Sequence, residues 1–181
     1  MRAGDACVTP EFHSRLVDLI PRLRRFAVAL TGDIDQADDL VQETCARALS
    51  RIEQWQEGTR LDSWVYRIAQ NLWFDHVRAR KVRGVHVALE VDAGDISGTD
   101  GRTVVESRLS LAAVNAAMAM LPGDQRVLVA LVCIDGVSYK EAAEITGVPI
   151  GTVMSRLARA RKQLHAALEG EQPSVSGQKL T

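Results

Sequence analysis

Residues 138–165 of the chain read SYKEAAEITGVPIGTVMSRLARARKQLH and carry its strongest structural signal. Ser138 and Glu141 have the spacing of a capping box, in which a hydroxyl and a carboxylate each bind backbone N–H groups at the start of a helix. Gly147 then interrupts the helical pattern, and apolar residues return at helical spacing beyond it. The stretch therefore predicts a short helix, a glycine turn and a longer helix, which together form a helix-turn-helix.

The longer helix, predicted over about 149–168, has two chemically different faces. The face expected to pack inward is apolar and consists of Val153, Leu157, Ala160 and Leu164. The opposite face carries hydroxyls first and cations later, namely Thr152, Ser155, Arg156, Arg159 and Lys162. This order suits the DNA major groove, where the helix start reaches base edges and later cations hold phosphates. The alternative is a helical hairpin with a solvated basic face, and DNA binding is favoured over it.

The segments upstream of this motif extend the helical pattern and then lose it. Helices are predicted from about Thr103 to Met120 and from Asp124 to Ile134, separated by Leu121-Pro122-Gly123. Between Gly84 and about Asp100, glycine, aspartate, serine and threonine accumulate and no period survives. This composition favours a flexible acidic linker.

The first third of the chain predicts a separate helical bundle. Apolar residues recur at helical spacing over three segments, about 11–30, 33–54 and 61–81. Pro21 sits inside the first segment, where its missing N–H should kink the helix or split it in two. Thr31-Gly32-Asp33 ends that helix and caps the next. Three helices with matching apolar stripes are enough for one compact core.

Four aromatic residues fall among the cations of the third segment. Trp64 lies on the apolar stripe, which assigns it to the core. Tyr66, Trp73 and Phe74 are open between two interpretations. A three-helix core could bury them, and an unstacked single strand of nucleic acid needs aromatic surfaces of the same kind.

The net charge of −1 hides blocks of opposite sign. Residues 33–54 hold six acids and two bases, a net charge of −4, and residues 84–107 hold five acids and one arginine. Residues 60–83 hold six bases and two acids, a net charge of +4, and residues 149–165 hold four bases and no acid. Because acidic and basic surfaces attract different molecules, two kinds of partner are predicted.

The bulk composition limits both the fold and the chemistry. Hydrophobic residues make up 46% of the chain and aromatic residues 4%, and alternating strand patterns are scarce, so an all-α fold is predicted. The sequence has no apolar signal core and no membrane-spanning run, so a cytoplasmic protein is expected. The three cysteines lack metal-site spacing, and no carboxylate, cysteine or serine arrangement surrounds the four histidines. We therefore expect no enzyme, no metal and no cofactor.

Several short motifs follow one another along the chain. DDLVQET (38–44), WVYRIAQN (64–71) and DHVR (75–78) resemble region 2 of the extracytoplasmic-function (ECF) RNA polymerase sigma factors, group 4 of the sigma-70 family. Leu121-Pro122, GVSYKEAA (136–143), VPIGTVMSR (148–156) and RAR (159–161) resemble region 4 of the same family. The resemblance covers about 11–83 and 107–168, in the family's order.

The resemblance implies a role for each polar surface. The family's acidic helix binds the clamp helices of the polymerase largest subunit, a role that falls here on Asp38, Asp39, Gln42 and Glu43. Stabilisation of a helix dipole could explain the two aspartates, but not a polar face that continues beyond the first turn. The family's region 2 also melts the promoter −10 element and holds a flipped base, which assigns that contact to Gln56, Gly58, Thr59, Arg60, Arg67, Gln70 and Asn71. Region 4 reads the −35 element, here through Thr152, Ser155, Arg156, Arg159 and Lys162, and meets the flap of the second-largest subunit.

The same resemblance implies an alternative sigma factor built from two small helical domains. It divides the chain into a disordered N-terminus (1–10), region 2 (11–83), a flexible linker (84–106), region 4 (107–168) and a disordered tail (169–181). The implied partners are core RNA polymerase, promoter DNA and an anti-sigma factor that hides the polymerase surfaces, as in a stress response. Met154 departs from the family pattern, since family members often carry a cation at this position.

One further class of protein is open as an alternative. A helix-turn-helix repressor or activator would account for residues 138–165 without any polymerase. It gives no reason for the acidic helix or for the basic aromatic helix. Binding of a palindromic duplex by the isolated protein would support it.

Overall fold

The computed structural model describes residues 9–56, 58–82 and 101–169, with side chains from residue 111 onward in the last stretch. These residues are helical and contain no strand, which confirms the predicted all-α class. The expected disorder at residues 1–10 and 169–181, and the greater part of the expected linker, lie outside the described residues.

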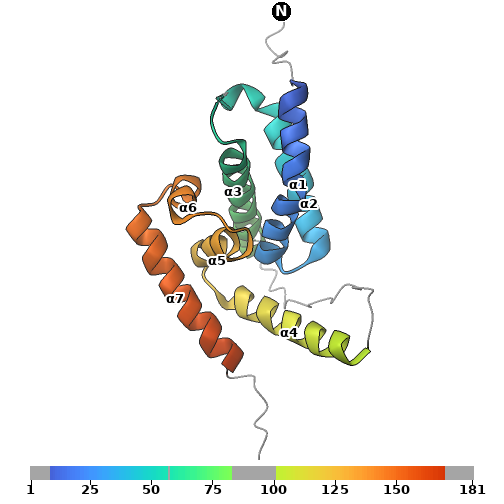
Figure 1. The fold of residues 1–181 in the computed structure, drawn as a ribbon, viewed down its shortest axis with the longest axis vertical. Helices are drawn as coiled ribbons and strands as arrows, with labels where there is room; N and C mark the ends of the chain where they lie inside the picture. The colour runs from blue at the N-terminus through green and yellow to red at the C-terminus, as the bar shows by residue number, and fades with distance from the viewer. Residues whose placement is uncertain (1–8, 57, 83–100, 170–181) are drawn as a thin grey trace, which may run out of the picture.

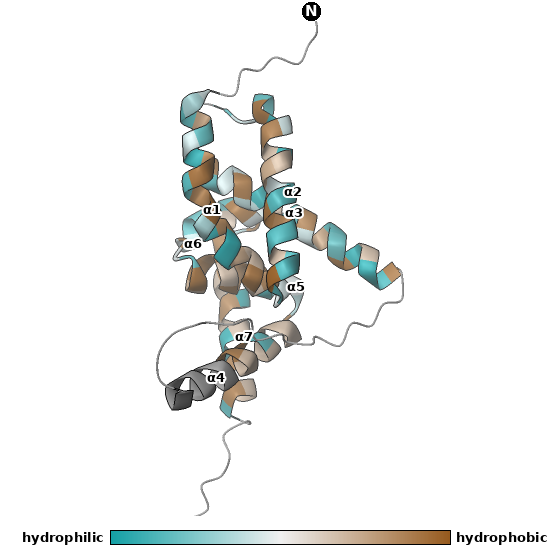
Figure 2. Ribbon diagram, turned by 90° about the vertical axis from the view of Figure 1, so that its right-hand side faces the viewer, coloured by the Kyte–Doolittle hydropathy of each residue, from teal (hydrophilic) through white to brown (hydrophobic). Residues whose placement is uncertain are grey.

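The N-terminal domain is a bundle of α1 (Pro10–Thr31), α2 (Ile34–Ser50) and α3 (Leu61–Val82), with a short 3-10 turn at Ile52–Gln54. α1 packs against both other helices (Figure 1). Apolar and polar bands alternate along α1 in Figure 2, as expected for a helix with one buried face. Its buried face consists of Phe12, Leu16, Leu19, Leu23, Phe26, Ala27 and Leu30.

α1 runs through Pro21 as a single helix, so the predicted split does not occur. Pro21 and Val17, whose carbonyl loses its helical partner to the proline ring, are both exposed, so water can reach the freed carbonyl. The end of the helix is as predicted. Gly32 adopts φ 72° and donates its N–H to the Val28 carbonyl, and the Asp33 carboxylate then accepts from the Gln36 N–H at 2.7 Å to cap α2.

The C-terminal domain contains α4 (Gly101–Met120), α5 (Gly123–Val129), a π-helical turn (Ala130–Ile134), α6 (Tyr139–Thr146) and α7 (Ile150–Glu169). The capping box is present: the Ser138 N–H donates to the Glu141 carboxylate at 3.0 Å, and the Glu141 N–H donates to the Ser138 hydroxyl. Gly147, at φ 69°, ends α6, and α7 follows directly. The predicted helix-turn-helix is therefore confirmed.

The two domains pack against each other rather than standing apart. α5 and α6 lie beside α3, and the π-helical turn meets α1 (Figure 1). Their buried apolar side chains form one continuous cluster. Tyr66 and Trp73 belong to it, at 0% and 5% exposure, so these two aromatic residues are core residues and not DNA-facing ones. Phe74 is partly buried against the same cluster.

Candidate functional site

The acidic surface lies along one side of α2, where residues 38, 39, 42 and 43 share a helical face. Asp39 and Gln42 are exposed, and Asp38 and Glu43 are partly so. The Arg24 guanidinium donates to Asp38 at 2.6 Å and lowers the pKa of that carboxyl below its ordinary value. The structure therefore brings the four predicted residues together as one negatively charged strip.

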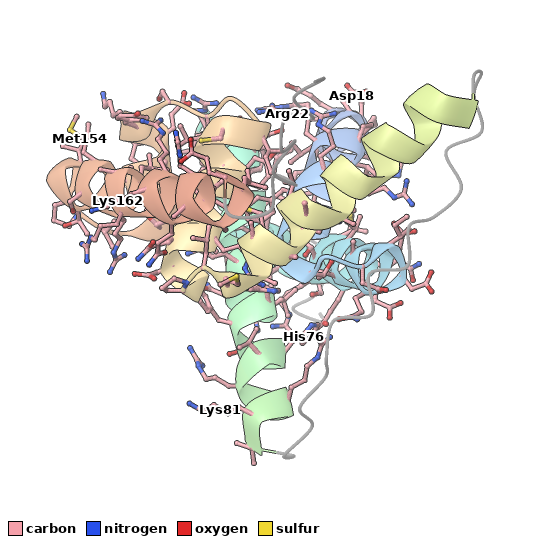
Figure 3. All side chains as sticks on the ribbon, turned by 90° about the horizontal axis from the view of Figure 1, so that it is seen from below. Asp18, Arg22, His76, Lys81, Met154 and Lys162 are labelled. Carbon is pink, nitrogen blue, oxygen red and sulfur yellow. The ribbon has the colours of Figure 1, made fainter. Side chains whose placement is uncertain are left out.

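Neighbouring helices hold the far end of this strip in place. Glu43 accepts a hydrogen bond from Arg47 one turn later in α2, at 3.0 Å, and lies 2.9 Å from the His76 Nε2 of α3. Beyond His76, the last turns of α3 with Lys81 project away from the rest of the molecule (Figure 3). The strip is thus anchored to α3 at one end and to α1, through Arg24, at the other.

A cavity of about 310 Å³ lies between the loop after α2 and the first turns of α3. Four residues singled out from the sequence line it, namely Gln56, Thr59, Arg60 and Arg67. The loop is held by its own turn, because the Thr59 N–H and hydroxyl both donate to the Gln56 carbonyl. Gly58 sits in this turn at φ 88°, a conformation that favours glycine.

The cavity also contains residues that the sequence analysis did not assign to it: Gln54, Trp55, Ser63, Trp64 and Glu144. The Trp55 indole N–H and the Ser63 hydroxyl are buried there without a protein hydrogen-bond partner. Native proteins rarely leave such groups unpaired, which often marks a site that a ligand or water completes. Trp55 opens the loop in sequence, and that position was the available signal for it.

The remaining predicted residues of this surface behave differently. Gln70 is 7% exposed and donates its side-chain amide to the Ile145 carbonyl of α6 at 3.4 Å. Arg67 donates to the carbonyls of Glu144 and Ile145 at the same helix end. Asn71 is exposed but does not line the cavity. Gln70 was expected on the polar side of its helix, and the C-terminal domain is what buries it.

The cation-bearing face of α7 is open to solvent. Ser155, Arg159 and Lys162 are exposed, whereas Thr152 and Arg156 are partly buried. Arg156 Nε lies 2.9 Å from the Asp124 carboxylate of α5. Met154 is 49% exposed, and Figure 3 shows it and Lys162 along the same helix. The opposite face is buried as predicted through Val153, Leu157 and Ala160, with Leu164 partly buried.

The described residues offer little to a metal or to a membrane. No cluster of three metal-ligating side chains occurs among them. None of the helices they form is both long and apolar enough to cross a bilayer.

Comparison with protein families matches two profiles to the chain. The profile "Sigma-70 region 2" matches residues 16–83, and the profile "Sigma-70, region 4" matches residues 111–164. The first match spans the three helices of the N-terminal domain, and the second spans the helix-turn-helix.

Similar proteins cover nearly the whole chain. The "ECF RNA polymerase sigma factor EcfG" of Rhodopseudomonas palustris is 39% identical over 161 residues, which are 89% of this chain and 87% of that protein. "ECF RNA polymerase sigma factor SigE" of Mycolicibacterium smegmatis is 34% identical over 89% of this chain and 63% of its own length. Among solved structures, the sigma factor RpoE of Bartonella quintana, determined in complex with the anti-sigma factor NepR, superposes with a TM-score of 0.73 at 30% identity, covering 91% of this chain and 100% of that one.

Proposed function

The chain belongs to the ECF RNA polymerase sigma factors of the sigma-70 family, and we propose that its three polar surfaces make the three contacts of promoter-specific transcription initiation. As a member of this family, it is an alternative sigma factor that binds core RNA polymerase and directs it to promoters. What remains to be assigned is which residues make each contact.

The acidic strip of α2 is proposed to bind the clamp helices of the polymerase largest subunit. Its four residues form one exposed strip, and the Arg24 bond that lowers the Asp38 pKa favours a charged carboxylate there. A fixed negative surface accelerates and orients docking on a basic partner. The flap of the second-largest subunit is proposed to meet the C-terminal domain.

The cavity beside α3 is proposed to hold a flipped base of the −10 element. Four residues predicted from sequence converge on this one cavity, and this observation carries the proposal. Its volume of about 310 Å³ is at the small end of ligand pockets, which start at roughly 300 Å³. The aromatic wall of Trp55 and Trp64 offers stacking surface, and Arg60 and Arg67 offer charge for the backbone. Gly58, Gln70 and Asn71 complete the proposed −10 set.

The exposed face of α7 is proposed to read the −35 element in the major groove. Thr152, Ser155 and Arg156 occupy the start of the helix, where base edges lie within reach. Arg159 and Lys162 follow one and two turns later, where they would hold phosphates. Met154, exposed on the same helix, replaces a cation with a neutral thioether.

An anti-sigma factor is proposed as the regulatory partner. The similarity to RpoE of Bartonella quintana, which was solved with the anti-sigma factor NepR, supports this proposal. We further propose that the chain has no catalytic activity of its own and acts in the cytoplasm, where the polymerase is.

In vitro transcription tests the function. Purified core enzyme and fragments of genomic DNA are incubated with and without the chain, and RNA 5′ ends are mapped. We expect initiation at a defined set of sites only when the chain is present. A core enzyme that gains no defined start sites would overturn the function.

The −10 pocket has its own test in the same assay. We expect Arg67→Ala to reduce promoter opening, followed as permanganate reactivity of unpaired thymines near −10. Arg78→Ala is the matched control, because Arg78 is an exposed arginine of the same helix that pairs with Asp75 and lies outside the cavity. Equal opening by both variants would remove Arg67 from the pocket.

A further inference from the structure

Several residues proposed for −10 binding are already engaged by the C-terminal domain. Arg67 and Gln70 donate to the backbone carbonyls that end α6, at Glu144 and Ile145. Arg60 forms an ion pair with the Glu141 carboxylate of the same helix. The carbonyls at a helix C-terminus carry partial negative charge, so they occupy these donors much as a phosphate would. DNA and α6 therefore compete for the same side chains.

The cavity proposed for the flipped base is also closed in part by this domain. Glu144 of α6 contributes to its lining, opposite the loop that carries Gln56 and Thr59. A carboxylate at the mouth of a base-binding cavity repels the phosphates that must pass it. The cavity is thus present in this arrangement but is guarded by the other half of the chain.

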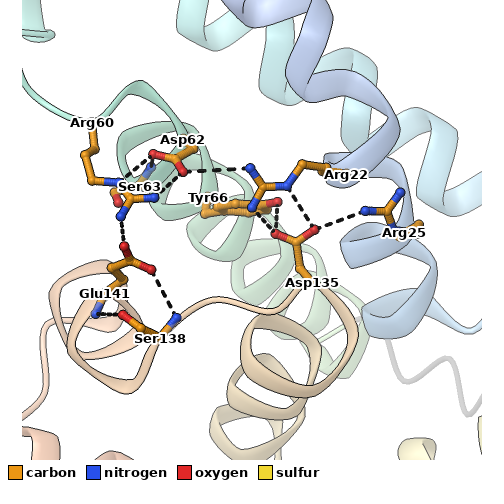
Figure 4. Close-up of polar contacts among 9 residues, drawn as sticks. All are labelled: Arg22, Arg25, Arg60, Asp62, Ser63, Tyr66, Asp135, Ser138 and Glu141. Carbon is orange, nitrogen blue, oxygen red and sulfur yellow. Dashed lines mark hydrogen bonds and ion pairs between the residues drawn. The ribbon is translucent and has the colours of Figure 1, made fainter.

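A buried carboxylate fastens the two domains together next to this site. Asp135, at the end of the π-helical turn, has a side chain with 0% exposure. It accepts hydrogen bonds from Arg22 at 2.8 and 3.3 Å, from Arg25 at 3.5 Å and from the Tyr66 hydroxyl at 2.5 Å (Figure 4). All three donors belong to the N-terminal domain. We call these four residues the Asp135 cluster.

Asp135 depends on this cluster, because an ionised carboxylate shielded from water needs charged or hydrogen-bonding partners. Tyr66 depends on it as well, since the phenol is wholly buried and Asp135 is the acceptor that its hydroxyl has. Separation of the domains would return Asp135 and both arginines to water. The cluster therefore holds the domains together by strong bonds, and water can replace those bonds once the domains part.

An apolar seam lies on the other side of α3. Gly123, the first residue of α5, approaches Trp73 and Phe74 so closely that a Cβ built there would stand 3.0 Å from Phe74 Cε1 and 3.2 Å from Trp73. Arg126 donates to the Leu30 carbonyl at 3.1 Å and covers the Trp73 ring. The Asp135 cluster and this seam grip α3 from two directions.

We propose that the chain inhibits itself: in the absence of polymerase the C-terminal domain is fastened over the −10 surface by the Asp135 cluster, and promoter binding requires the two domains to separate. This inference rests on the proposed −10 site. It adds that the −35 domain is the first competitor for that site, before any anti-sigma factor binds. Core polymerase would open the chain by offering each domain a separate surface.

Two variants of the full chain test this by independent routes. Asp135→Ala removes the shared acceptor, and Asp18→Ala is its control, since Asp18 is an exposed carboxylate one turn before Arg22 (Figure 3) and outside the cluster. Gly123→Leu inserts a wedge against α3, and Gly151→Leu is its control, because a Cβ at Gly151 meets nothing within 4 Å. Only groups of the N-terminal domain crowd Gly123, so the wedge leaves the inside of the C-terminal domain intact.

The first measurement is the radius of gyration by small-angle X-ray scattering, which needs no DNA. We expect both test variants to be larger than the wild type and both controls to match it. Far-ultraviolet circular dichroism checks that helix content is retained, and Gly123→Leu decides the question if Asp135→Ala loses helix.

The second measurement is the affinity for a fluorescent single strand with the −10 sequence of a mapped start site. We expect it to rise about tenfold in the test variants, as when a binding-competent fraction of about one tenth becomes the whole population. Unchanged size in both variants would overturn the closed state, and larger size without tighter binding would overturn the competition. Failure of the wild type to initiate with core enzyme would instead overturn the proposed function, while scattering would still decide the closure.

Discussion

Arg156 illustrates how one side chain of α7 is prepared for its proposed contact. It lies in the second turn of the helix with its Nε 2.9 Å from the Asp124 carboxylate, and its side chain is 29% exposed. The carboxylate restricts the guanidinium while leaving other N–H groups to reach a base. A fixed arginine loses less freedom on binding than a mobile one.

Replacement of this residue is the prediction at the residue scale. Arg156→Ala should weaken discrimination at one base pair of the −35 element by about 1–3 kcal/mol, the range for a bidentate base contact. The measurement is transcription by the holoenzyme from promoters with single −35 substitutions. Arg161→Ala is the control, because Arg161 is an exposed arginine of α7 that instead bonds the Tyr139 hydroxyl. Arg156 leaves the reading set if its variant keeps the wild-type preference at every −35 position.

α2 is the element whose polar face has no task within the fold. Its apolar face packs against α1 and α3, and its opposite side carries the acidic strip. Bonds to Arg24 and Arg47 involve side chains that are largely exposed, and such ion pairs add little stability. Substitutions on this strip should therefore change binding and leave folding intact.

The prediction at this scale concerns core polymerase. Asp38→Lys combined with Asp39→Lys should lower affinity for the core enzyme by about 100-fold or more, because like charges placed at an interface cost several kcal/mol. A pull-down with purified core and a thermal melt of the free chain measure the two properties. Asp35→Lys is the control, since Asp35 is an exposed acid of the first turn of α2 outside the strip. Wild-type affinity of the double variant would count against the clamp contact.

At the scale of the molecule, two DNA-binding surfaces differ in how accessible they are. The outer face of α7 is exposed, whereas Arg67 and Gln70 are held against α6. The isolated chain thus presents a single basic helix to duplex DNA, with few phosphate contacts. Affinity of this kind is weak and falls with salt.

This difference predicts how the whole chain binds. Alone, it should bind duplex promoters only in the non-specific range, with a Kd of about 10⁻⁴–10⁻⁶ M, and it should become sequence-specific when core polymerase is added. Gel-shift titrations with promoter and scrambled duplexes, with and without core enzyme, measure both. Tight, specific binding of a palindromic duplex by the chain alone would favour an ordinary repressor or activator instead.

Short-range chemistry explains why so much of the secondary structure was predictable. The capping box at Ser138 and Glu141, the glycine ends at Gly32 and Gly147 and the Asp33 cap all act within a few residues, and all formed as predicted. The helical pattern also sorted the faces of α7 correctly. Pro21 was the exception, because its effect depends on whether the freed carbonyl can reach water.

The arrangement of the domains was beyond such signals. Asp135 and Arg22 are 113 residues apart, and periodicity places a residue on a face without saying what covers that face. Tyr66 and Trp73 could have faced a core or a nucleic acid strand until their packing was known, and Gln70 seemed polar until α6 covered it. Local hydrogen bonds and spacing define helices, their ends and a list of candidate residues. Long-range packing defines which of those residues are free to bind.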